Sequence, residues 1–95
     1  MAFANEQQYE DMISALQTFK STAQEKCQTL SSAGTDCVDN TENDPAATKA
    51  NASIQKCVGE ISSALEEIDR IAQALADELE DIRAAAAKAD SLGDS

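Results

Sequence analysis

The sequence contains no histidine and no tryptophan, and its aromatic residues are two phenylalanines and one tyrosine. Proline occurs once and glycine three times. So few large side chains give little bulk to a globular core, whereas an apolar content of 42% with many alanines suits helices packed along a narrow seam. The composition therefore predicts an all-α fold, and the length of 95 residues predicts a single domain over residues 1–95.

Basic side chains are also scarce, with 7 against 18 acidic ones and a formal net charge of -11. Such a chain cannot neutralise phosphates, which argues against binding to DNA or RNA, and its charge favours solubility. No apolar run has the length of a membrane span, and none follows a basic start at the N-terminus. We therefore expect no membrane span and no ordinary secretory signal.

The groups that catalysis usually needs are missing as well. The sequence has no Gly-rich phosphate loop, no Ser or Cys beside a base, and no carboxylate set with a histidine ligand. One acidic cluster, Asp77, Glu78, Glu80 and Asp81, points to several sides of its predicted helix. We expect a protein that is not an enzyme and that has no cofactor and no metal site.

Three cysteines, Cys27, Cys37 and Cys57, form an odd set without a Cys-x-x-Cys pair, and without histidine they do not predict a zinc site. Cys27 and Cys57 fall almost level in a hairpin centred near Asn40, so a disulfide between them is geometrically feasible. Two buried reduced thiols or a bridge between chains are the alternatives. The cellular compartment decides among them, and the sequence does not name it.

A strict seven-residue pattern organises the second half of the chain. Its first row is Ile54, Ile61, Ile68, Leu75, Ile82 and Ala89, and its companion row is Cys57/Val58, Ala64/Leu65, Ile71/Ala72, Leu79 and Ala85/Ala86. Two such rows are typical of a helix that packs lengthwise on another helix. Asp44 followed by Pro45 is a start signal, because Asp caps a helix and Pro is tolerated at its first position. The pattern predicts a helix from residue 45 to about 91.

A shorter helix is predicted over about residues 5–33. Asn5 suits its N-cap, and Gly34 suits a C′ position in the left-handed conformation. Residues 35–43 are rich in Asn, Asp and Thr, which favour turns, so a loop is predicted over residues 34–44. Gly59 in the second helix either allows the first helix to approach or is simply exposed.

Two amphipathic helices joined by a short loop predict an antiparallel hairpin with a long second helix. With these bounds the first helix ends opposite about residue 75, so the later apolar residues of the second helix have no partner within the chain. Burial of one Leu or Ile stabilises by about 1.5–3 kcal/mol, and a two-helix hairpin has no second layer to cover it. We expect a helical partner or a second copy to complete the fold.

The whole chain resembles the WXG family of small helical-hairpin proteins of type VII secretion, in particular the WXG-like accessory proteins encoded with LXG toxins in Gram-positive bacteria. The likeness is carried by residues 68–72, 79–85 and 89–90 of the second helix. The Trp-x-Gly of the family turn is absent, and no aromatic residue follows Phe19 to form a C-terminal export signal. In this family a partner can carry that signal, which favours the accessory type.

The resemblance implies a binding protein that engages the helical N-terminal domain of an LXG-type toxin, or a related small helical protein, and helps to target it for export. The residues facing this partner would be Leu75, Leu79, Ile82, Ala86 and Ala89. The resemblance also implies a place in the bacterial cytoplasm, or secretion with the partner by a route that needs no signal peptide. The alternative is a homodimeric structural protein with these residues in its core.

Overall fold

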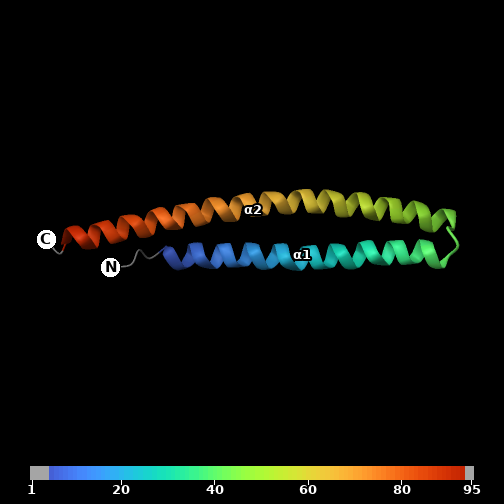
Figure 1. The fold of residues 1–95 in the computed structure, drawn as a ribbon, viewed down its shortest axis with the longest axis horizontal. Helices are drawn as coiled ribbons and strands as arrows, with labels where there is room; N and C mark the ends of the chain where they lie inside the picture. The colour runs from blue at the N-terminus through green and yellow to red at the C-terminus, as the bar shows by residue number, and fades with distance from the viewer. Residues whose placement is uncertain (1–4, 94–95) are drawn as a thin grey trace. The chain divides into compact units, whose positions relative to one another are not determined.

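A computed structural model describes residues 5–93 and contains two helices, α1 (Glu6–Asn40, 35 residues) and α2 (Pro45–Gly93, 49 residues). Figure 1 shows the two helices joined by one tight turn. The predicted all-α hairpin with a longer second helix is confirmed.

The hairpin divides into two compact units, each made of antiparallel segments of α1 and α2. The loop unit comprises residues 19–67 and includes the turn. The terminal unit comprises, within the described chain, residues 5–18 and 68–93. The prediction of a single domain over residues 1–95 stays a prediction.

The first helix does not end at Gly34, as the sequence indicated, but continues to Asn40. Gly34 does not have a positive φ; the left-handed residues are Glu42 and Asn43, with φ of 53° and 61°. The Asn43 amide donates to the Val38 carbonyl at 3.1 Å, the six-to-one bond that ends many helices. Most of the predicted loop over residues 34–44 is therefore helical, because the reversal occurs at Glu42 rather than at a glycine.

The start of α2 is confirmed. The Asp44 carboxylate accepts hydrogen bonds from the backbone amides of Ala46 at 3.0 Å and Ala47 at 3.1 Å. Helix α2 begins at Pro45, whose missing N–H would have no helical partner at that position. Asp44 thus caps two of the amide groups that a helix start leaves unpaired.

Each unit has a thin core. The buried apolar residues are Cys27 and Leu65 in the loop unit and Ala72 and Leu79 in the terminal unit, and no described side chain is fully buried. The three from α2 are seven residues apart, as the repeating pattern predicts. Two helices alone cannot enclose more, because each packs against one neighbour only.

Gly34 has a role other than the C′ role expected from the sequence, whereas Gly59 follows one of its two expected alternatives. Gly34 is buried against α2, and a Cβ atom placed there would lie 2.3 Å from Asn51 Oδ1 and 3.5 Å from Ile54 Cδ1. Gly59 is exposed, and a Cβ atom there would meet nothing within 4 Å. The close approach of the two helices that was considered for Gly59 therefore occurs at Gly34.

The first turn of α1 reaches further along α2 than predicted. Glu6 Oε1 accepts a hydrogen bond from Arg83 Nε at 3.0 Å, and Glu10 pairs with the same guanidinium. The expectation that the first helix ends opposite residue 75 is wrong, because α1 takes in most of the predicted loop and so pairs with a later part of α2.

Candidate functional site: the apolar side of each unit

The two flanks of the helix contact in the loop unit differ in chemistry. Residues three or four apart on a helix are neighbours. On α2, Ile61 and Cys57 therefore lie on one flank of the face that contains Val58 and Leu65, and Gln55 lies on the other flank. On α1, Leu30 and Phe19 occupy one flank of Cys27, and Ser31 occupies the other. The loop unit therefore has an apolar side and a polar side.

Side-chain hydrogen bonds close the polar side. Ser31 Oγ donates to Gln55 Oε1 at 2.8 Å, and Gln55 Nε2 donates to the Ser31 carbonyl at 3.1 Å. The same amide nitrogen lies 2.9 Å from Asn51 Oδ1. This network joins α1 to α2 and, because its members are half-buried, fixes the register of the two helices.

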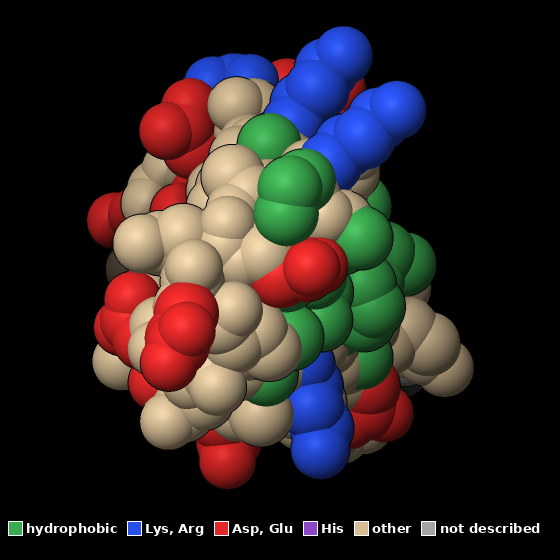
Figure 2. Space-filling model, turned by 90° about the vertical axis from the view of Figure 1, so that its right-hand side faces the viewer, with side chains coloured by type: hydrophobic (Ala, Val, Ile, Leu, Met, Phe, Trp, Pro, Cys, Tyr) green, Lys and Arg blue, Asp and Glu red, His purple; other side chains and the backbone are tan. Residues whose placement is uncertain are grey.

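The apolar side is open. It contains a groove of about 350 Å³ lined by Phe19, Ala23, Lys26, Cys27, Leu30 and Ile61. Phe19 remains 58% exposed, Leu30 42% and Ile61 36%. Figure 2, which looks onto the loop end, shows hydrophobic side chains gathered along one side, with acidic and uncharged side chains on the opposite side.

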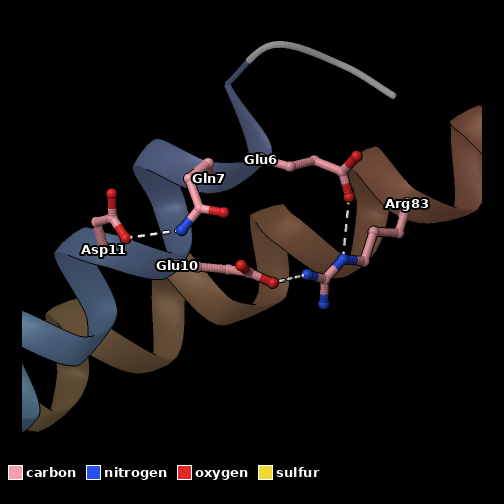
Figure 3. Close-up of polar contacts among 5 residues, drawn as sticks. All are labelled: Glu6, Gln7, Glu10, Asp11 and Arg83. Atoms are coloured by element: carbon pink, nitrogen blue, oxygen red, sulfur yellow. Dashed lines mark hydrogen bonds and ion pairs between the residues drawn. The ribbon is translucent and has the colours of Figure 1, made fainter. Parts of the chain in front are cut away.

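The terminal unit also has a polar flank. Arg83 of α2 bridges Glu6 and Glu10 of α1, and Gln7 donates to Asp11 at 2.8 Å on the neighbouring turn (Figure 3). The pKa of Arg83 is raised, first by its hydrogen bond to Glu6 and then by that to Glu10. Because the pair is solvent-exposed, it contributes little stability.

A hollow of about 210 Å³ lies on the polar flank of the terminal unit. It is lined by Ile13, Gln17, Asp69, Ala72, Gln73 and Ala76. Large apolar residues are exposed in this unit too, with Met12 at 51% and Ile71 at 41%. Ile71 adjoins Leu75, four residues on, which is half-buried. Exposed apolar surface thus occurs in both units.

The residues predicted to face a partner all lie in the terminal unit, but they differ in how deeply they are buried. Leu79 is buried within the chain, which corrects the expectation that it faces outward. Leu75, Ile82 and Ala86 are half-buried and Ala89 is exposed, so these four retain surface that a partner could cover. Whether they bind one stays a prediction.

Phe19, Leu30 and Ile61 of the groove are not among the residues that the sequence predicted to face a partner. The seven-residue pattern contained Ile61, but as part of the inner wall of the hairpin. The width of the apolar stripe in the sequence was the signal that could have indicated the groove. Two helices that pack only on each other need a narrower apolar stripe than these helices have.

The cysteines are free thiols in this structure, with Cys27 buried and both Cys37 and Cys57 exposed. Cys27 lies in the wall of the groove. The disulfide between Cys27 and Cys57 that the sequence allowed stays a prediction that depends on compartment.

Within residues 5–93, no group of histidine, cysteine or acidic side chains is placed to hold a metal ion. The described helices also contain no stretch that is apolar enough over sufficient length to cross a bilayer. The chain matches no family model, and no curated protein or solved structure matches it.

Proposed function

We propose that this chain is a non-catalytic binding protein whose apolar side docks a helical segment of a partner. The observation that carries the proposal is the groove of the loop unit, where three large apolar side chains, Phe19, Leu30 and Ile61, remain exposed beside one another. Contiguous apolar surface of this kind, unlike scattered apolar residues, is typical of interaction sites. A helix laid into a groove with its apolar face inward is a recurring mode of recognition.

The finer proposal is that the partner is the helical N-terminal domain of an LXG-type toxin and that the chain helps to target it for type VII secretion. Its support is the hairpin of two long helices, the net charge of -11 and the sequence pattern of residues 68–90. In this role the chain would cover the apolar face of the toxin domain in the bacterial cytoplasm and present the pair for export.

A homodimer is the second candidate. The apolar flanks of α1 and α2 lie on the same side of the loop unit, so two copies could bury them in a four-helix arrangement. The charge of -11 on each copy opposes this association. We therefore place it second.

The test is affinity purification of the tagged chain from its native host, followed by mass spectrometry. We expect a large protein with a helical N-terminal domain, encoded beside this chain, to be retained. Ile61→Asp, which puts a charge on the groove wall, should abolish retention. Ser63→Asp, at an exposed position on the other side of α2, should leave it unchanged. Recovery of further copies of this chain alone would support the homodimer, and retention by Ile61→Asp would refute the proposed surface.

A further inference from the structure

The last part of α1, residues 35–40, is built from poor helix formers. This tip segment reads Thr-Asp-Cys-Val-Asp-Asn, and all of these residue types rank below Ala, Leu, Lys and Glu in helix propensity. The side chains of Thr, Asp and Asn also bond to nearby backbone groups in non-helical conformations. The sequence favoured a loop here for that reason, although α1 continues to Asn40. The helical structure of the tip segment is therefore opposed by its own residues.

The charges of the tip segment also oppose the helix. The last turn of α1 has no basic side chain, whereas Asp36 and Asp39 place carboxylates near its C-terminus. The carbonyl groups at a helix C-terminus carry partial negative charge, so acidic side chains there are unfavourable. Within residues 5–93, Lys49, the basic residue of α2 nearest the turn, forms no ion pair with either carboxylate. Nothing in the described chain thus offsets these two charges.

Packing on α2 gives the tip segment little support. Val38 is half-buried, and the other residues of the segment are exposed. The side-chain hydrogen bonds are local, because Thr35 Oγ1 donates to the Ser31 carbonyl at 3.2 Å and Asn40 Nδ2 donates to the Asp36 carbonyl at 2.8 Å. Bonds to a carbonyl four residues earlier do not join α1 to α2. The tip segment is thus held mainly by local contacts.

The support from α2 begins at Gly34. Gly34 is buried against Asn51, and one turn earlier Ser31 exchanges two hydrogen bonds with Gln55 of α2. Segments that open on their own have few buried apolar contacts and exposed backbone hydrogen bonds. The tip segment meets both conditions, whereas Cys27 and Gly34 bury the preceding turns of α1.

The start of α2, on the other side of the turn, is better supported. The Asp44 carboxylate accepts from the amides of Ala46 and Ala47, and Pro45 at the first helical position has no amide hydrogen to satisfy. This cap involves no residue of the tip segment. The two helix ends that meet at the turn therefore differ in stability.

We propose that the tip segment is an order–disorder element of the hairpin. Its residues unwind together into a longer connection over residues 35–44, while α1 up to Gly34 and α2 from Pro45 keep their structure. The end of the hairpin then changes length and shape without disturbing the groove, whose lining residues on α1 end at Leu30. Neither change requires a partner in the groove.

Amide hydrogen exchange of the full chain, measured for each residue by NMR at one protein concentration, tests the proposal. After correction for intrinsic rates, we expect the amides of residues 37–40 to exchange about tenfold faster, or more, than those of residues 24–30. They should share one protection factor, and low concentrations of urea should leave it almost unchanged because local opening exposes little surface. The amides of residues 49–51, beyond the capped start of α2, should stay as protected as residues 24–30.

Asp36→Ala with Asp39→Ala tests the cause. The double variant removes both carboxylates from the helix end and adds two strong helix formers, so exchange in residues 37–40 should slow by about five- to thirtyfold. Exchange in residues 24–30 should stay the same. The control Glu25→Ala removes an exposed acidic side chain from the middle of α1, and should leave the tip segment unchanged.

Equal protection across residues 24–40 would overturn the proposal. Rates that fall residue by residue from Asn40 inward would also overturn it, because that pattern is the fraying of any helix end. The same holds if residues 49–51 lose protection together with the tip segment, or if the double variant exchanges as fast as the wild-type chain.

Discussion

Alanine substitution at the two mid-helix glycines should change stability in different ways, because their surroundings differ. At Gly59 the new methyl group meets nothing within 4 Å, so the chain gains the higher helix propensity of alanine, about 1 kcal/mol. At Gly34 the methyl group would lie 2.3 Å from Asn51 Oδ1. The same gain in propensity is then opposed by a clash.

The size of this clash follows from what Asn51 does. Its Oδ1 atom accepts a hydrogen bond from Gln55 Nε2 at 2.9 Å, and Gln55 in turn bonds to Ser31 on α1. Moving Asn51 loses at least one hydrogen bond, at about 0.5–1.5 kcal/mol, and any residual overpacking adds about 1–3 kcal/mol. We therefore expect Gly34→Ala to lie between about neutral and about 3.5 kcal/mol less stable after its gain in propensity of about 1 kcal/mol.

Urea unfolding followed by circular dichroism measures both variants, at one protein concentration because association changes apparent stability. A difference of 1 kcal/mol also corresponds to about 4–8 °C in Tm for a domain of this size. In an Asn51→Ala background the obstacle is gone, and Gly34→Ala should become stabilising. If Gly34→Ala stabilises the wild-type chain as much as Gly59→Ala does, the close approach at Gly34 is refuted.

Three further substitutions test other parts of the fold. Asp44→Ala should cost about 0.5–2 kcal/mol of stability in urea unfolding, because it removes the cap of α2, whereas Asp39→Ala should not. Glu42→Gly should raise the free energy of unfolding by about 0.5–1 kcal/mol, and with it the Tm, because glycine adopts the φ of 53° without steric cost. A lower Tm would contradict the left-handed turn. Arg83→Ala should speed amide hydrogen exchange in the first turn of α1, around Tyr9, more at low salt than at high salt, and unchanged exchange would argue against the bridge.

The sequence predicted the hairpin but placed its turn too early. The Asp44-Pro45 start signal was sufficient because the cap is local and involves backbone amides two and three residues away. The end of α1 was not predictable in this way, since Gly34 offered a left-handed residue that the chain does not use and Glu42 gave no such signal. Packing against Asn51 is what requires glycine at position 34.

The error in the turn affected the candidate site. Once α1 extends to Asn40, it reaches Arg83 and covers Leu79, so the expected overhang is largely occupied. The groove could have been inferred only from the joint position of Phe19, Leu30 and Ile61, which depends on the register between two helices. Side-chain contacts between α1 and α2, such as the hydrogen bonds of Gln55 to Ser31, fix that register. The apolar periodicity of each helix does not reveal such contacts.

We propose above that the apolar side of the loop unit contacts another protein. Site-specific photocrosslinking in the native host tests it most directly, with the photoreactive residue placed either at Ile61, on the groove wall, or at Ser63, on the opposite side of α2. We expect a crosslink to one larger protein from position 61 and none from position 63. A crosslink from position 63 alone, or no adduct from position 61, would contradict it.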